Sequence, residues 1–168
     1  MQKLPLALLS LTLLCACAPR TTTAEATLRP THGNTAAGTM TFAQTGADLL
    51  IKGAFTGLTP GAHGLHIHVY GDCSGSAATA AGPHFNPFGK RHGPPGGKSS
   101  HLGDLPMLTA GADGTARFEA RMDVMTVEEG PTSIAGRSVI ITARPDNFTT
   151  QPDGASGARI SCGVIKLK

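Results

Sequence analysis

The stretch GLHIHVY, residues 64–70, decides the fold class of this chain. Apolar and polar side chains alternate along it, so His66 and His68 face one way and the apolar residues beside them face the other. Alternation with a period of two is typical of a strand that is buried on one face. The stretch therefore predicts a strand with a hydrophobic core on one side and a pair of imidazoles on the other.

Further short strands are expected on both sides of this stretch, because turn signals such as TPG at 59–61 and GADG at 111–114 divide the apolar runs. No segment of ten or more residues shows a helical period. The expected strands occupy residues 26–31, 39–44, 49–56, 64–70, 105–109, 115–123, 137–143 and 159–167. About eight strands at this spacing predict an all-β fold, an eight-stranded Greek-key β-barrel or sandwich.

Two long functional loops are expected, over residues 74–100 and residues 144–157. The first is rich in glycine and proline and has no apolar period, and the second is polar. Long loops without secondary structure of their own are usually functional in compact domains.

Length and charge exclude several classes of protein. The 168 residues suffice for one hydrophobic core, and 15% charged residues are too few for a coiled coil. The net charge of +3 comes without a basic stripe that alternates with aromatic residues, so no nucleic-acid partner is expected. A mildly positive surface suits a small anionic substrate.

The first residues form a targeting segment. Lys3 is followed by an apolar run over residues 4–14 that is too short to span a bilayer. The sequence LCAC then resembles the lipobox of bacterial lipoproteins, with Cys17 as the lipidated residue. This interpretation divides the chain into a signal peptide (1–16), a flexible tether (17–25) and one domain (26–168).

Two other interpretations of this segment remain open. One is an ordinary secretory signal that is cut after Ala16 or Ala18. The other takes Cys15 and Cys17 as a metal-binding pair, which their apolar flanks disfavour. Export leaves Cys73 and Cys162 in an oxidising compartment, where one disulfide is expected, with two buried free thiols as the alternative.

Five histidines and an aspartate lie between residues 66 and 104. The first two are the strand pair, and His84, His92, His101 and Asp104 follow in the long loop or at its end. Imidazole and carboxylate ligands together suit Zn(II) or Cu(II) better than Mg²⁺ or Ca²⁺. His63 is interpreted as structural, with a side chain that reaches a loop carbonyl, and His32 as a bystander.

Several strings of this sequence together resemble the copper–zinc superoxide dismutase family. They are GAHGLHIH (61–68), GDC (71–73), AGPHFNP (81–87), HGPP (92–95), HLGDLP (101–106), GR (136–137) and GARISCGVI (157–165). The resemblance extends over residues 26–167 and implies that family's β-barrel fold. It also identifies Arg137 as a structural residue, for which we expect an ion pair at a strand end.

The resemblance implies two adjacent metal sites that share His84. The implied zinc ligands are His84, His92, His101 and Asp104. The implied copper ligands are His66, His68 and His84. Asp146 would link the two sites by holding His66 and His92, and Arg159 would guide the superoxide anion at the channel mouth. Cys73 and Cys162 would form the family's disulfide.

One position departs from the family pattern. The family has a further copper-binding histidine four residues before the aspartate that corresponds to Asp146, and this chain has Thr142 there. A hydroxyl is a weak, hard ligand for copper. We therefore expect about one Zn(II) per chain and weakly bound copper.

Two functions follow from this resemblance. The first is an exported enzyme that converts superoxide to oxygen and hydrogen peroxide, with activity weakened by Thr142. The second is a non-catalytic lipoprotein that binds or buffers zinc. In either case we expect a location in the bacterial cell envelope, in the periplasm or on the outer surface, and membrane contact only through a lipid anchor. A homodimer and a copper donor are the expected protein partners.

Overall fold

The computed structural model describes residues 20–168, so the predicted signal peptide and Cys17 lie outside the described residues. The described strands are β1 (Thr21–Pro30), β2 (Ala37–Thr45), β3 (Asp48–Thr56), β4 (Gly61–His63), β5 (Leu65–His68), β6 (Leu108–Ala110), β7 (Ala116–Met122), β8 (Ser138–Thr142) and β9 (Arg159–Leu167). The helical content of this part of the chain is one 3₁₀ turn, η1 (Thr79–Ala81). Between residues 20 and 168, no helix has the length and apolar character needed to cross a membrane.

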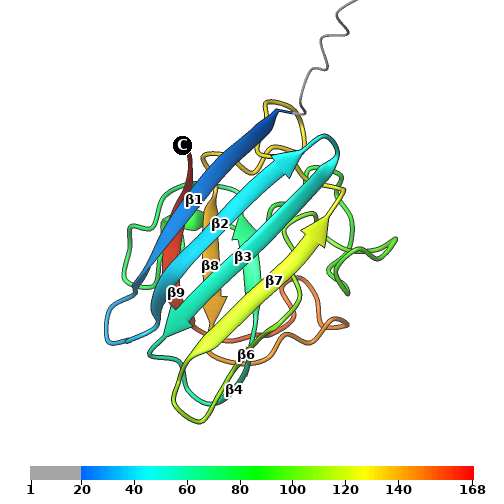
Figure 1. Cartoon of the computed structure of the whole chain (residues 1–168). Helices are drawn as coiled ribbons and strands as arrows, with labels where there is room; N and C mark the ends of the chain where they lie inside the picture. The colour runs from blue at the N-terminus through cyan, green and yellow to red at the C-terminus, as the bar shows by residue number, and fades with distance from the viewer. Residues whose placement is uncertain (1–19) are drawn as a thin grey trace, which may run out of the picture.

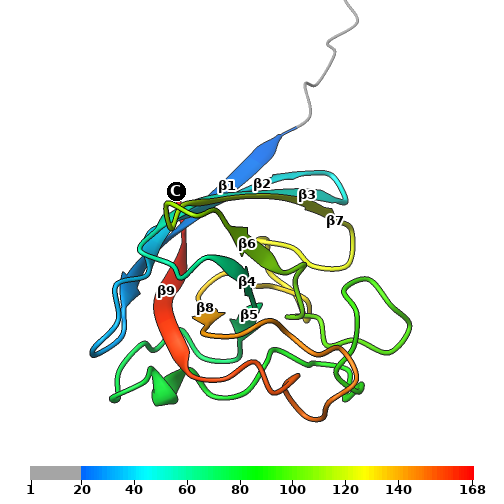
Figure 2. The ribbon, with the colours of Figure 1, turned by 90° about the horizontal axis from the view of Figure 1, so that it is seen from below.

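Seven of the strands form one antiparallel sheet in the order β5-β8-β9-β1-β2-β3-β7, and β4 pairs with β6. The sheet curls upon itself (Figures 1 and 2): β1, β2, β3 and β7 make one layer, and β9 turns away from it to carry β8 and β5. The predicted all-β barrel or sandwich is therefore confirmed. The short strand β4 was not predicted separately, because three residues carry too little pattern.

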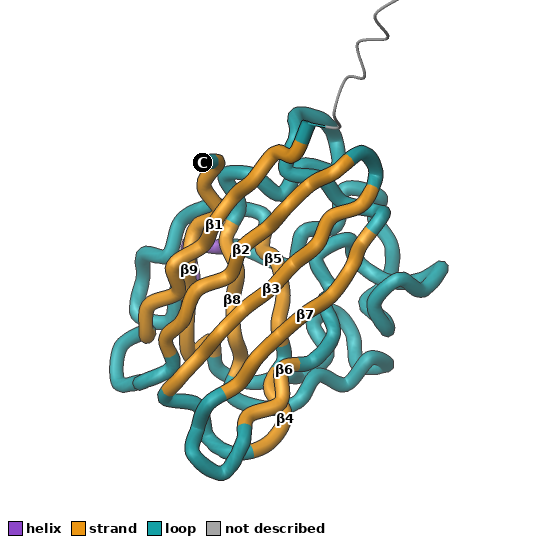
Figure 3. The backbone as a smooth tube through the Cα atoms, in the orientation of Figure 1, coloured by secondary structure: helices purple, strands orange, loops and turns teal. Residues whose placement is uncertain are grey.

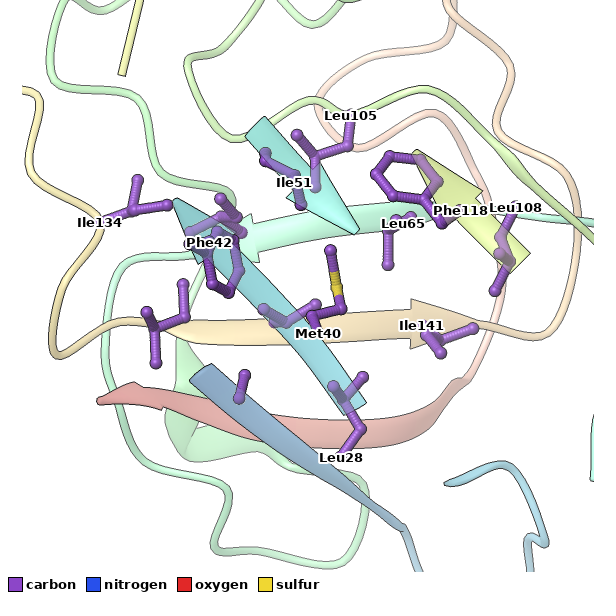
Figure 4. Packing of buried hydrophobic residues seen from close by; sticks show 14 of the residues in the cluster. Leu28, Met40, Phe42, Ile51, Leu65, Leu105, Leu108, Phe118, Ile134 and Ile141 are labelled. Carbon is purple, nitrogen blue, oxygen red and sulfur yellow. The ribbon is translucent and has the colours of Figure 1, made fainter. Parts of the chain in front are cut away.

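The hydrophobic core lies between these two layers. Met40 and Phe42 of β2, Leu65 of β5 and Ile141 of β8 belong to this core (Figure 4), and all four side chains are almost fully buried. The strands of the first layer bury every second residue, as the alternating sequence requires. Each fully buried leucine, isoleucine, phenylalanine or methionine among them contributes about 1.5–3 kcal/mol through burial of apolar surface.

The predicted tether is wrong over residues 21–25. These residues belong to β1, where Thr21 pairs with Thr45 and Ala24 is buried beside Phe42. Threonine and alanine side chains carry little apolar signal, whereas the neighbouring strand supplies a full set of backbone hydrogen bonds. The domain therefore begins earlier than the sequence pattern indicates.

Two other strands are shorter than predicted. The predicted strand 105–109 begins only at Leu108, since Pro106 has no N–H to pair. The predicted strand 64–70 ends at His68, because the N–H groups of Val69 and Tyr70 bond to the carbonyls of Pro83 and Ala81 in the following loop.

The two long loops lie together beside β5 and β8, away from the first layer (Figures 2 and 3). One joins β5 to β6 and the other joins β8 to β9. A disulfide between Cys73 and Cys162, with Cα atoms 5.7 Å apart, connects the first loop to β9. The disulfide prediction is confirmed, and the alternative of two free thiols is wrong.

Candidate metal centre

The free edge of β5 holds the loop residues in register with the strand. Ile67 accepts a hydrogen bond from the N–H of Phe85 (2.8 Å) and donates to the carbonyl of Gly103 (2.9 Å). As a result His68 lies opposite His84, and His66 lies opposite Asp104. A Cβ on Gly103 would meet the carbonyl oxygen of Ile67 at 2.2 Å, so glycine permits this close approach.

A first group of side chains gathers three imidazole nitrogens around one carboxylate oxygen. Oδ1 of Asp104 lies 3.0 Å from Nδ1 of His84, 3.1 Å from Nδ1 of His92 and 3.4 Å from Nδ1 of His101. Ligands 2.0–2.1 Å from a tetrahedral zinc ion are separated from each other by about 3.3 Å. All four side chains are buried. The predicted zinc ligands therefore lie together with a spacing that fits this ion.

A second group, formed by His66, His68 and His84, lies beside the first. Nε2 of His66 donates to Asp146 (2.8 Å), and Nδ1 of His68 donates to the carbonyl of Gly82 (2.7 Å). The remaining nitrogens, Nδ1 of His66 and Nε2 of His68, are buried without any hydrogen-bond partner. A buried unpaired nitrogen is costly, and both could donate a lone pair to a metal ion.

His84 belongs to both groups. Because an imidazole has two ring nitrogens, one can serve each group. The donor set of the second group is nitrogen only, which suits copper or zinc and not Mg²⁺ or Ca²⁺. The structure therefore brings together all six side chains that were predicted as zinc or copper ligands.

Asp146 connects the two groups through one carboxylate. Its Oδ2 accepts from His66 (2.8 Å) and its Oδ1 accepts from Nε2 of His92 (2.9 Å). These bonds leave Nδ1 of both histidines free to bind a metal, since a neutral imidazole carries one proton. A Cβ on Gly154 would overlap Oδ1 of Asp146, so this position of the second loop also requires glycine.

Thr142 lies at the end of β8 beside the second group. Its side chain is buried, and its hydroxyl donates to the carbonyl of Gly64 (3.3 Å). The carbonyl of Thr142 accepts from Nδ1 of His63 (2.8 Å), whose Nε2 lies 2.9 Å from the carbonyl of Thr59. His63 thus has the structural role that was predicted, and His32 is exposed in a groove that the disulfide cysteines also line.

Arg159 lines a cavity of about 510 Å³ together with His68, His84 and Thr142. Its guanidinium donates to the carbonyl of Ala78 (2.8 Å) and to that of Gly82 (2.7 Å), the carbonyl that also holds His68. The predicted guiding arginine is therefore in the wall of the cavity that opens on the second group.

Burial disfavours the charged form of three imidazoles of the site. Desolvation lowers the pKa of His68 to about 2, and it also lowers the pKa values of His66 and His101. For Asp104, desolvation raises the pKa, but the hydrogen bond from His84 and the nearby histidines together bring it below its usual value. Neutral imidazoles and an ionised carboxylate are the protonation states that bind metal.

Gln151 supports the site and was missed by the sequence analysis. The amide of Gln151 accepts from the N–H of His92 (2.9 Å) and donates to its carbonyl (2.9 Å), which ties the second loop to the first. No local sequence signal marks such a contact.

Arg137 forms no ion pair within residues 20–168. It donates to the carbonyls of Ser133 and Val69 and stacks on Phe85 instead, which corrects that prediction.

Comparison with known proteins agrees with this geometry. Residues 36–165 match the sequence profile of copper/zinc superoxide dismutase. Over 157 residues the chain is 40% identical to the extracellular copper–zinc superoxide dismutase of Brugia pahangi, an alignment that covers 88% of this chain and 77% of that protein. On its sequence, its curled sheet and its paired histidine groups, this chain belongs to the copper/zinc superoxide dismutase family.

Proposed function

We propose that this chain is an exported superoxide dismutase whose copper group has only three histidines. The observation that carries the proposal is the pair of buried, unpartnered nitrogens on His66 and His68, next to the group built around Asp104. In this assignment His66, His68 and His84 hold copper. The zinc ligands are His84, His92, His101 and Asp104. Bound there, copper would supply the one-electron chemistry that turns two superoxide anions and two protons into dioxygen and hydrogen peroxide.

The protein's own residues position the reactants. Arg159 keeps its positive charge in the cavity wall and attracts a small anion toward His68 and His84. Asp146 orients His66 and His92 through its two oxygens. The carbonyl of Gly82 fixes His68 and Arg159 at once, so the metal ligand and the guiding charge keep a constant separation.

Thr142 sets the limit on activity in this proposal. Its hydroxyl is engaged with the carbonyl of Gly64 and is a poor copper ligand. When the shared His84 is bound elsewhere or protonated, only His66 and His68 remain for copper. We therefore expect weak copper binding and slow turnover.

The threonine at position 142 also favours a second candidate, a zinc-binding member of the family without dismutase activity. The group around Asp104 is complete and independent of Thr142. Stable folding around zinc and little copper are expected for this candidate, which would bind or buffer zinc in the cell envelope.

The location proposed for either function is outside the cytoplasm. The disulfide supports export, because such bonds persist in oxidising compartments. The matched relative is named as an extracellular protein. Lipid attachment at Cys17 and anchoring in a bacterial envelope complete this proposal, and mass spectrometry of the mature N-terminus tests both.

The two candidates are separated by measuring superoxide consumption with defined metal content. The parent chain and Thr142→His are each loaded with zinc alone and with zinc plus copper. A dismutase predicts a parent rate with both metals that exceeds the rate of free copper and lies below that of the variant. A parent chain that binds one zinc ion, retains no copper and shows no added rate would favour the second candidate.

A further inference from the structure

The cavity beside Thr142 opens directly on the group of three histidines. Its volume is about 510 Å³, and it is lined by His68, His84, Thr142, Ser156 and Arg159 among others. Ligand sites of small molecules span about 300–1,000 Å³, so the space exceeds the needs of a single five-membered ring. Three protein ligands and an accessible fourth position are typical of metal sites that take an external ligand.

Thr142 does not complete the group. Its side chain is short, and its hydroxyl already donates to the carbonyl of Gly64 at 3.3 Å. If a Cβ were added to Gly64, it would lie 2.5 Å from Oγ1 of Thr142 and 2.8 Å from Cε1 of His66. The threonine therefore lies beside the histidine group at the floor of the cavity.

No imidazole of this chain is available to fill the position. Of the seven histidines, five belong to the two metal groups. His63 has both ring nitrogens engaged with backbone carbonyls. His32 lies exposed in a different groove, beside Cys73 and Lys166. A further imidazole must therefore come from outside the chain.

The charges around the cavity favour a neutral donor. Arg159 contributes a positive charge, and Asp153 in the same wall contributes a negative charge that acts on it. Two N–H groups of the guanidinium already donate to the carbonyls of Ala78 and Gly82. A neutral imidazole is not repelled by the positive charge of Arg159, as an ammonium group would be, and imidazole is a ligand that copper prefers.

We propose that this cavity binds an imidazole from outside the chain, free or carried by a histidine of another polypeptide. This imidazole completes the copper group by supplying the nitrogen that Thr142 does not provide. The inference rests on the proposed copper-binding role of His66, His68 and His84. It assigns the cavity a ligand class and explains how a chain with only three copper-binding histidines reaches a four-nitrogen site.

The test is a titration with imidazole of the protein loaded with zinc and copper. The protein is kept in molar excess over copper. Electron paramagnetic resonance and the visible absorption of Cu(II) report the number of nitrogen ligands, and competition with a chelator reports copper affinity. We expect a saturable spectral change, one additional nitrogen and copper that binds at least tenfold tighter. An N-acetylated tripeptide with a central histidine is run in parallel, and saturation by the peptide at lower concentration assigns the donor to a polypeptide.

Two variants provide controls. Thr142→His supplies the donor from within the chain, so it binds copper tightly and shows no response to imidazole. Thr142→Val keeps the shape of the side chain without its hydroxyl, so it responds as the parent does. Sodium acetate at equal concentration tests a small anion in place of imidazole and is expected to add no nitrogen ligand to Cu(II) and to leave the copper affinity unchanged.

The outcomes distinguish this inference from the proposed function. Copper that binds with four nitrogens before any imidazole is added overturns the inference but not the proposed function. An acetate response equal to that of imidazole, or a loss of the parent's copper affinity in Thr142→Val, also overturns the inference but not the proposed function. Failure to bind copper in the parent, with or without imidazole, overturns both.

Discussion

The carboxylate of Asp146 fixes the proton positions of two histidines that belong to different groups. Each of its oxygens accepts one Nε2–H, from His66 or from His92, at 2.8 and 2.9 Å. Both imidazoles are thereby forced to present Nδ1 to their groups. A residue that touches neither proposed metal can in this way control the affinity of both.

Asp146→Asn is expected to weaken zinc and copper binding together. The amide keeps one acceptor, but its NH₂ group faces an Nε2–H donor, so one histidine loses its orientation. Loss of such an outer partner weakens metal affinity by about 10–100-fold. Chelator competition measures both affinities, with the exposed Asp113→Asn as the matched control. Equal affinities in the parent and Asp146→Asn would contradict the proposed linkage.

The metal-free protein is expected to lose stability in acid through its buried imidazoles. The pKa of His68 is about 2 in the folded chain and about 6.5 when unfolded, so the unfolded state takes up a proton first as the pH falls. Stability is unaffected by His68 above pH 6.5 and decreases by about 1.4 kcal/mol per pH unit below it. His66, whose pKa is also lowered by burial, adds to the effect.

Denaturant unfolding at pH 7, 6 and 5 in the presence of a chelator measures this loss. In His68→Gln the decrease between pH 7 and pH 5 is expected to be smaller than in the parent chain. His32→Gln, at an exposed position, leaves it unchanged. A parent and a His68→Gln variant with the same acid sensitivity would show that His68 is not the group that titrates.

At the scale of elements, β5 shows what the sequence could and could not predict. The alternation of residues 64–70 correctly placed His66 and His68 on one face, because a strand's side chains follow a period of two. The loop segments that pair with its edge through Phe85 and Gly103 were not predicted, since contacts between distant backbones leave no local pattern. For the same reason Gln151 was missed, whereas the clustered histidines were found by residue type alone.

Gly103→Ala is expected to disturb both the edge of β5 and the neighbouring Asp104. The new Cβ would meet the carbonyl oxygen of Ile67, which as backbone cannot move aside. Overpacking of this kind costs about 1–3 kcal/mol, and zinc affinity falls with the displacement of Asp104. Thermal unfolding and zinc competition measure the two effects. Gly111→Ala, where the nearest atom belongs to the exposed side chain of Asp113, serves as the control, and equal behaviour of the two variants would refute the close approach.

At the scale of the whole molecule, one layer supplies much of the hydrophobic core and the other carries the metal ligands. The layer of β1, β2, β3 and β7 contributes apolar side chains to the core and no member of either histidine group. The groups lie on β5 and in the first loop. The disulfide fastens the first loop to β9, Asp146 fastens the second loop to β5, and Gln151 ties the two loops together. The barrel fold was predictable from strand patterns, but the fastening of the loops depends on tertiary contacts.

Removal of the disulfide is expected to destabilise the whole molecule. The bond joins residues 89 positions apart, and loss of such a crosslink costs about 2–5 kcal/mol. The variant Cys73→Ser with Cys162→Ala leaves no thiol in the described domain, and its unfolding is expected to be insensitive to reductant. The parent in reductant serves as the comparison and approaches the variant's stability. Identical melting temperatures for the oxidised parent and the variant would rule out this contribution.

Because the two faces of strand β5 differ, metal binding also depends on the correct pairing of β5 with β8. A slip of one residue in its pairing with β8 would turn the imidazoles into the hydrocarbon interior and the leucine and isoleucine toward the loops. A misaligned chain would therefore lose the group of His66, His68 and His84, and only correctly aligned molecules would gain the stability of an ion bound there. An ion bound in that group would thus favour the chain whose β5 is correctly paired with β8.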